Sequence, residues 1–251
     1  MIARGFTPHK NQRQIIENIL NSNTKHHIVS VGRQFGKSLM GINLLLNWGI
    51  NNKGCKILWV SPVYSQTNKV QKEIDNAIRH TSIIESCNYS ESYIKLRTGS
   101  EIYFRSAERY DNIRGFTFDY AILDEAAFMR SETWFEAVRP TLAVRGKKCL
   151  FLSTPKGRNW FYDIYELGNS IDNENYNSYR GTSMDTPYIS KDEIDDAKKT
   201  LPPNIFKQEY MAEFIDDGGE VFSNIDKNTY KWGSKQEHSG QLYCGIDLGR
   251  V

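Results

Sequence analysis

The sequence predicts an α/β fold in which a mostly parallel sheet carries helices on both faces. Short apolar runs of strand length alternate with helical patterns as far as residue 152, and this alternation is typical of parallel sheets with helical crossovers. The chain has 251 residues, of which 39% are hydrophobic and 25% charged. This composition excludes collagen, coiled-coil and disordered chains, and the length is enough for one large domain, with or without a fragment of a second.

The expected elements follow one another along the chain. Apolar runs predict strands over 27–31, 56–60, 118–123 and 148–152. Helical periodicity predicts helices over 9–22, 37–49 and 66–79. Two alternating runs, 93–96 and 101–104, flank a Thr-Gly-Ser turn and predict a β-hairpin.

The residues after the last buried strand differ in composition. Two acidic helices, split by a pair of prolines, are expected over 190–200 and 203–213. They predict a small helical lid at the end of the main domain, followed by a polar linker and an unfinished apolar strand. The predicted boundaries are 1–215 for the domain, about 160–215 for its lid, 216–239 for the linker and 240–251 for the start of a second domain.

The charge of the chain is unevenly distributed. The net charge is +2, but residues 1–60 hold eight basic residues and one acid, whereas residues 161–226 hold five basic and fifteen acidic residues. A basic amino-terminal part suits a nucleotide or a nucleic acid, although two solvated faces of opposite sign would give the same pattern. The sequence shows no membrane-length apolar run, no signal peptide and no paired cysteines, so we expect a cytoplasmic protein.

The strongest local motif lies between the first apolar strand and the following helix. It reads Gly32-Arg33-Gln34-Phe35-Gly36-Lys37-Ser38. Backbone N–H groups of such a turn face an anion, the lysine reaches the β- and γ-phosphates, and the serine hydroxyl is a ligand for Mg²⁺. Val31 takes the place of the first glycine of the general P-loop pattern. The motif still predicts a nucleotide-phosphate site, although an ordinary strand-to-helix turn could carry the same tripeptide.

Polar side chains also end two later strands. Asp124 and Glu125 follow an apolar strand 86 residues after Ser38, where P-loop ATPases hold Mg²⁺ and orient the attacking water. Ser153 and Thr154 end the next strand; their hydroxyls could contact the γ-phosphate or its water, or close a turn before proline. Together with the phosphate loop, these positions predict a P-loop NTPase of the class with an additional strand and a catalytic glutamate (ASCE).

The order of these motifs resembles the large terminase subunit of tailed bacteriophages. The matching segments are the phosphate loop, Leu123-Asp124-Glu125-Ala126 and Ser153-Thr154-Pro155-Lys156-Gly157. In that family the phosphate loop is a variant with an arginine after its first residue, which is the departure seen here. The resemblance extends to Gln12, similar to a glutamine that reads adenine, and to three further segments. These are Asn112-Ile113-Arg114-Gly115, Phe206-Lys207-Gln208-Glu209-Tyr210 and Gly245-Ile246-Asp247-Leu248-Gly249.

The resemblance implies a role for each matching residue. Ser38 and Asp124 are expected to hold Mg²⁺, and Glu125 is expected to be the catalytic carboxylate. Arg33 would contact phosphate within its own subunit, and Arg114 would be an arginine finger for a neighbouring subunit. The residues expected to bind ATP are Gln12, Gly32, Arg33, Gln34, Phe35, Gly36, Lys37, Ser38, Ser153 and Thr154.

The resemblance also implies a function and partners. It predicts an ATP-driven motor that translocates double-stranded DNA into a viral procapsid, without dependence on DNA sequence. The expected partners are the portal protein, the small terminase subunit and further copies of the chain in a ring, with a monomer in isolation. The expected location is the host cytoplasm and, transiently, the procapsid, but not the mature virion. Two alternatives stay open: a helicase-like DNA-remodelling ATPase, and a nucleotide-dependent docking module that does not hydrolyse ATP.

A last acid, Asp247, follows an apolar strand and is flanked by glycines. RNase H-like nucleases and the sugar-kinase and actin group both place a carboxylate in this way, and the terminase resemblance favours the nuclease. The chain ends four residues later. We therefore expect a longer protein whose nuclease cuts concatemeric DNA with Mg²⁺ or Mn²⁺, and no DNA cleavage by this fragment.

Overall fold

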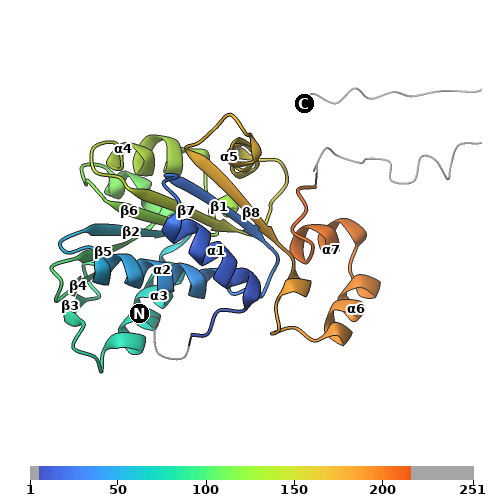
Figure 1. Ribbon diagram of the computed structural model, residues 1–251, viewed down its shortest axis with the longest axis horizontal. Coiled ribbons are helices and arrows are strands. Elements are labelled where there is room, and N and C mark those ends of the chain that lie inside the picture. Colours follow the sequence, from blue (N-terminus) through green and yellow to red (C-terminus); the bar gives the residue numbers. More distant parts are fainter. Residues whose placement is uncertain (1–5, 216–251) are drawn as a thin grey trace, which may run out of the picture. The chain divides into compact units, whose positions relative to one another are not determined.

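The computed structural model describes residues 6–215 (Figure 1). These residues build an eight-stranded sheet of order β3-β4-β5-β2-β6-β7-β1-β8. The strands are β1 His26–Val31, β2 Lys56–Ser61, β3 Ile84–Asn88, β4 Tyr93–Leu96, β5 Glu101–Ser106, β6 Tyr120–Asp124, β7 Lys148–Ser153 and β8 Tyr176–Gly181. The helices are α1 Lys10–Asn21, α2 Lys37–Asn51, α3 Tyr64–Ile78, α4 Arg139–Thr141, α5 Trp160–Asn169, α6 Lys191–Thr200 and α7 Pro203–Glu209. Short 3₁₀ turns cover Ala107–Ile113, Ala126–Phe128 and Ser183–Asp185, and a π-helical turn covers Thr133–Val138.

The strand order places the predicted motifs side by side. All strands from β5 to β8 in the sheet order are parallel, whereas β4 is antiparallel to β5 and β3 is antiparallel to β4. Strand β7 lies between β1 and β6. Because parallel strands end at the same edge, the residues that follow β1, β6 and β7 meet there. The mostly parallel α/β sheet predicted from the sequence is thus confirmed.

The two faces of the sheet carry separate apolar clusters. Along β2, Ile57 and Trp59 belong to one cluster, which includes buried residues of α1, α2 and α3. Leu58 and Val60 belong to the other cluster, with α5 and the residues that follow β6. Successive side chains of a strand point to opposite faces, so a nearly continuous apolar run supplies both clusters. The central strands are therefore buried on both sides.

Most elements lie where the sequence predicts them, and the differences have physical reasons. Strand β3 was not expected, because its residues are only partly buried or exposed and carry no apolar alternation. It forms by pairing with β4, which extends the predicted hairpin into a three-stranded antiparallel end of the sheet. Helix α3 begins at Tyr64 rather than 66, and α7 ends at Glu209 rather than 213.

The segment predicted as a helical lid is divided in the structure. Helix α5 packs on β8 and β1, and β8 pairs in parallel with β1 from His26 to Val31. This segment therefore belongs to the main sheet, which corrects the expectation of a lid that begins near residue 160. Strand β8 reads Tyr-Asn-Ser-Tyr-Arg-Gly, a polar sequence that an edge strand tolerates but that gives no apolar signal. The helical part is α6 and α7, with a small cluster of Ile194, Ala197 and Phe206.

Several predictions concern residues that the structure does not describe. The linker over 216–239 and the strand over 240–251, with Asp247, lie outside the described residues. Within residues 6–215, no helix is both long and apolar enough to cross a membrane.

Candidate active site

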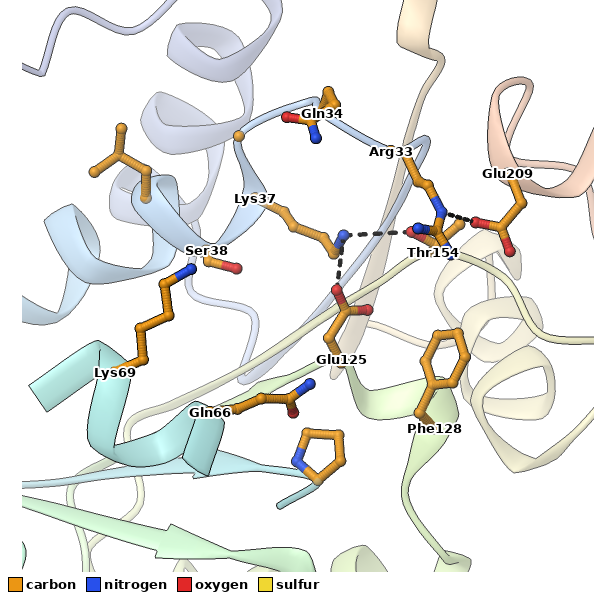
Figure 2. A pocket seen from close by; sticks show the side chains of 13 residues that line it. Arg33, Gln34, Lys37, Ser38, Gln66, Lys69, Glu125, Phe128, Thr154 and Glu209 are labelled. Atoms are coloured by element: carbon orange, nitrogen blue, oxygen red, sulfur yellow. Dashed lines mark hydrogen bonds and ion pairs between the residues drawn. The ribbon is translucent and has the colours of Figure 1, made fainter. Parts of the chain in front are cut away.

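A pocket of about 560 Å³ opens at the carboxyl edge of the parallel strands (Figure 2). Its walls come from the loop after β1 with the start of α2, from the residues after β2, β6 and β7, and from the end of α7. Ligands of open α/β sheets bind outside the carboxyl ends of the strands. The pocket therefore lies where the three predicted motifs converge.

The phosphate loop has a backbone that depends on its glycine. Gln34 and Gly36 both have positive φ values, 59° and 84°, and α2 begins directly afterwards with no side-chain cap. A Cβ atom added at Gly36 would lie 2.5 Å from Nε2 of Gln12, so a larger residue would be both strained and crowded. The uncapped start of α2 leaves backbone N–H groups directed at the pocket, as an anion site requires.

Gln12 lies beneath this loop. Its side chain is fully buried, and its Nε2 donates hydrogen bonds to the carbonyls of Phe35 (2.9 Å) and Gly36 (3.2 Å). Its Oε1 accepts a hydrogen bond from the backbone N–H of His9. The amide therefore fastens α1 to the phosphate loop, and reading adenine, which stays a prediction, would require it to give up some of these bonds. The side chain of Phe35 is buried against Gly181, so only the backbone of this residue is available to a ligand.

Lys37, Glu125 and Thr154 meet inside the pocket. The Lys37 Nζ lies 3.0 Å from Oε1 of Glu125 and donates a hydrogen bond of 3.3 Å to Oγ1 of Thr154 (Figure 2). The second oxygen of Glu125, Oε2, is buried and has no hydrogen-bond partner among the described residues. Glu125 also has a positive φ of 60°, a costly conformation for a non-glycine residue that is found most often at functional sites. One oxygen of this carboxylate is held by Lys37 and the other is buried without a hydrogen bond.

Ser38 and Asp124 form the adjacent pair. The Ser38 hydroxyl donates a hydrogen bond of 3.0 Å to Oδ1 of Asp124. Burial, and then the charge of Glu125, raises the pKa of Asp124 to about 7. A divalent cation would relieve the cost of ionising this buried carboxylate. A hydroxyl and one carboxylate are the oxygen ligands with which proteins hold Mg²⁺ beside nucleotide phosphates, so the pair fits that ion.

The phosphate loop is also joined to the helical segment of α6 and α7. Arg33 forms an ion pair with Glu209 at the end of α7, and its backbone N–H donates to the Glu209 carbonyl (2.8 Å). The Ser183 hydroxyl donates to the Arg33 carbonyl (2.7 Å). Gly32 is needed for this close approach, because an added Cβ would lie 2.6 Å from the Tyr210 carbonyl oxygen. A movement of either segment would therefore be transmitted to the other.

Ser153 and Arg114 are two of the predicted residues that do not line this pocket; Gln12, Gly32, Phe35 and Asp124, described above, do not line it either. The Ser153 hydroxyl is buried and donates to the Thr154 carbonyl while accepting from the N–H of Ala127. It joins the end of β7 to the turn after β6, so among the two predicted hydroxyls only Thr154 lines the site. Arg114 lies outside the pocket of its own chain, where it pairs with Asp111 (3.3 Å) and Glu136 (2.9 Å).

Six lining residues are not among the predicted nucleotide contacts, and two of them are Leu39 of α2 and Pro62 after β2. Gln66 and Lys69 come from α3, Phe128 follows β6, and Glu209 ends α7. Glu209 lies within a segment that carries the resemblance, which implies no role for this residue. The signal for the α3 pair is that β2 ends at Ser61 beside the other parallel strands, so the helix after it begins at the same edge.

Known proteins resemble this chain in both sequence and fold. Residues 28–229 match the family described as "Terminase large subunit, T4likevirus-type, N-terminal". The large terminase subunit of Escherichia phage T5 is 30% identical over 99% of this chain and 59% of its own length. That of Thermus phage G20c is 29% identical over 88% of this chain and 52% of its own length. The large terminase ATPase domain of Thermus phage P74-26 has a TM-score of 0.71 and 27% identity, over 84% of this chain and 95% of that domain. The chain thus spans little more than half the length of the curated relatives that it matches.

Proposed function

The chain belongs to the family of phage large terminase subunits, and we propose that its described part is the ATPase domain of a DNA-packaging motor. The observation that carries the proposal is the meeting of Lys37, Glu125 and Thr154 beside the Ser38–Asp124 pair. A phosphate-binding lysine, a metal-binding pair and a carboxylate with one uncommitted oxygen are the groups that ATP hydrolysis needs. They reach one pocket from three strands.

Binding and orientation of ATP fall to the phosphate loop. The backbone N–H groups at the start of α2 and the Lys37 ammonium hold the β- and γ-phosphates. The side chain of Lys37 is only 11% exposed, so its charge is little screened by water and acts strongly on a phosphate. Bound to Ser38 and Asp124, Mg²⁺ would neutralise charge that develops on the phosphate oxygens.

Glu125 acts on the attacking water. Its Oε1 is bound by Lys37 and its unpartnered Oε2 is buried, so the carboxylate has to release Lys37 or turn before it accepts a hydrogen bond from the water that attacks the γ-phosphorus. When the phosphate draws Lys37 toward itself, the Glu125 carboxylate gains freedom to serve as the base. Arg33 gives a further positive charge on the loop side of the pocket.

Arg114 is assigned to a neighbouring subunit. Arg114 does not line the pocket of its own chain, and half of its side chain is exposed. Both observations support a role across a subunit interface. A ring of subunits would then complete each site with a positive charge that stabilises the transition state. In the full-length protein this ring would thread double-stranded DNA into the procapsid, on the portal protein and with the small terminase subunit, in the host cytoplasm.

A concentration series tests the ATPase and the shared site. We expect Mg²⁺-dependent ATP hydrolysis whose rate per molecule rises with protein concentration and with double-stranded DNA. A mixture of Arg114→Ala and Lys37→Ala subunits should recover part of the activity, since each supplies what the other lacks. No hydrolysis at any concentration would contradict the ATPase, and strictly additive activity of the mixture would contradict the action of Arg114 in trans.

A further inference from the structure

One wall of the pocket is built by the first turns of α3, outside every motif described above. Gln66 and Lys69 lie three residues apart on this helix, and both line the pocket (Figure 2). Strand β2, which leads into α3, is parallel to β6, with Val60 beside Leu123. The helix therefore begins next to Asp124 and Glu125, at the end of the pocket where the terminal phosphate would be cleaved.

The position of α3 is fixed by the face of the helix that adjoins Gln66 and Lys69. Thr67, Val70 and Ile74 are buried, and the Thr67 hydroxyl donates a hydrogen bond of 3.2 Å to the carbonyl of Arg105 in β5. Residues three and four apart share one face of a helix, so the buried face leaves Gln66 and Lys69 toward the pocket. The backbone that carries Lys69 is therefore well anchored, although its side chain is long and free to turn.

The charges of the pocket single out Lys69. The lining residues include three cations, Arg33, Lys37 and Lys69, and two carboxylates, Glu125 and Glu209. Arg33 is paired with Glu209 and Lys37 with Glu125. Only the charge of Lys69 has no carboxylate partner among the residues that line the pocket.

The partner of Lys69 lies outside the pocket and holds it weakly. It is Glu73, one turn along α3, at 3.9 Å, and the two side chains are 77% and 48% exposed. Exposed pairs of this kind contribute little. In Figure 2 the Lys69 amine is directed toward the Ser38 side of the pocket, so a phosphate bound there could replace Glu73 at small cost.

We propose that Lys69 binds the terminal phosphate of ATP within its own subunit, as a second lysine of the site opposite Lys37. This inference rests on the proposed ATPase function and adds to it a residue that distinguishes ATP from ADP. The Lys37 ammonium comes from α2 and the Lys69 ammonium from α3. A γ-phosphate between them carries the charge that ADP lacks, so Lys69 contributes to the binding of ATP and little to that of ADP.

The test compares Lys69→Met with Lys72→Met in the 251-residue chain. Lys72 is an exposed lysine on the same helix that does not line the pocket, so it controls for the loss of one positive charge. Titration calorimetry with Mg²⁺ and either ATPγS or ADP gives the two dissociation constants. We expect Lys69→Met to weaken ATPγS binding about tenfold and ADP binding less than about twofold. Lys69→Arg should keep most of the ATPγS affinity, and Lys72→Met should change neither constant.

The other outcomes would contradict the role of Lys69 alone or the ATPase function as well. Unchanged ATPγS binding by Lys69→Met, an equal loss for both nucleotides, or the same loss in Lys72→Met would overturn the inference and leave the ATPase standing. Failure of the unmodified chain to bind either nucleotide would overturn the proposed function and the inference together.

Discussion

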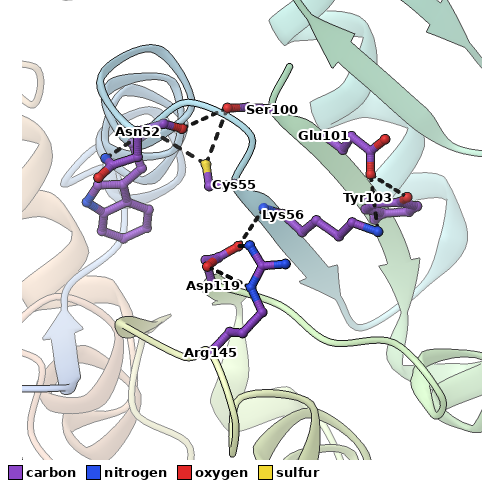
Figure 3. A network of polar contacts seen from close by, with 9 residues as sticks. Asn52, Cys55, Lys56, Ser100, Glu101, Tyr103, Asp119 and Arg145 are labelled. Atoms are coloured by element: carbon purple, nitrogen blue, oxygen red, sulfur yellow. Dashed lines mark hydrogen bonds and ion pairs between the residues drawn. The ribbon is translucent and has the colours of Figure 1, made fainter. Parts of the chain in front are cut away.

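Two aspartates of the same strand segment behave in opposite ways. Asp119 precedes β6 at the amino edge of the sheet and Asp124 ends β6 at the carboxyl edge, and both are almost completely buried. Asp119 accepts hydrogen bonds from the backbone N–H of Lys56 (2.8 Å) and from Nε and Nη2 of Arg145 (3.2 and 2.9 Å; Figure 3). Asp124 accepts a hydrogen bond from the Ser38 hydroxyl and is also stabilised by the Glu125 backbone and the Lys37 charge, but burial and the Glu125 carboxylate outweigh these groups.

The difference in hydrogen-bond partners distinguishes a carboxylate that stabilises the fold from one that we expect to serve a ligand. The Asp119 carboxylate is held by a cation and a backbone N–H group, so it joins the start of β6 to β2 and to the loop before β7. Asp124 has no cation in direct contact among the described residues, and burial, followed by the charge of Glu125, raises its pKa to about 7. A protein tolerates such a carboxylate when a ligand completes its surroundings. The amino edge therefore holds the sheet together, and the carboxyl edge keeps charged groups ready for a ligand.

The largest expected effect is a loss of ATP turnover on substitution of Glu125, at the carboxyl edge of the sheet. Replacing Glu125 with Gln should lower ATP turnover at least about 100-fold, because the amide cannot act as a base. ATP affinity should stay within about threefold, since Lys37 and the loop amides hold the phosphates. Steady-state rates and equilibrium binding measure the two effects. Lys37→Ala is the control that should weaken binding itself, and a Glu125→Gln protein with half the normal rate would remove Glu125 from the mechanism.

Asp124→Asn separates the two aspartates by activity. It should reduce Mg²⁺-dependent turnover by about 100-fold, because the neutral amide is a poor ligand for Mg²⁺. The nucleotide-free protein should lose no stability, since the variant no longer buries a carboxylate with few donors. Turnover and urea unfolding without nucleotide measure the two properties. A destabilised Asp124→Asn protein would mean that this carboxylate supports the fold as Asp119 does.

Asp119→Asn should lower the stability of the fold and leave ATP turnover nearly unchanged. The amide keeps one acceptor but directs N–H groups at the donors of Arg145 or Lys56, which should cost about 2 kcal/mol of unfolding free energy. Turnover at a temperature where the protein is folded should stay within about threefold. The same urea unfolding series measures the loss. Equal stability of Asp119→Asn and the unmodified chain would show that the amino-edge network in Figure 3 contributes nothing.

An effect that appears only at acidic pH concerns a histidine at the amino end of β1. Burial lowers the pKa of His27 to about 4, and its ring is hydrogen-bonded to the Tyr179 hydroxyl and the Thr24 carbonyl. Because the folded-state pKa lies below the unfolded value of about 6.5, the stability from this group is complete above pH 6.5 and is lost as pH falls toward 4. At pH 5 the loss should be on the order of 2 kcal/mol.

A variant without the titrating ring isolates this contribution. The decrease in unfolding free energy between pH 7 and pH 5 should be smaller for His27→Gln than for the unmodified chain. The buried neighbour His26, whose pKa is also lowered to about 4, stays in both proteins. An identical decrease in both proteins would show that His27 does not contribute to the loss.

The site could be predicted to the extent that its residues are contiguous in the chain. Lys37 and Ser38 belong to one short motif, and Asp124, Glu125 and Thr154 end strongly apolar runs. A parallel sheet brings the ends of such strands to one edge whatever their separation in sequence. The α/β class, the central strands and the meeting of these five residues at one edge therefore followed from local patterns, whereas their roles in catalysis stay predictions.

Tertiary structure decided what local patterns leave open. An exposed lysine on α3 looks the same in sequence whether it faces a pocket or bulk water, so only the packing of α3 brings Lys69 to the site. Gln12 is expected to contact adenine from the resemblance, and only the fold shows that it is buried under the phosphate loop. Strand β8 is polar and forms because β1 offers an unpaired edge. Each of these outcomes depends on a partner far away in the chain, and the physical reason is that contacts between distant segments, rather than intrinsic propensity, set burial and hydrogen bonding.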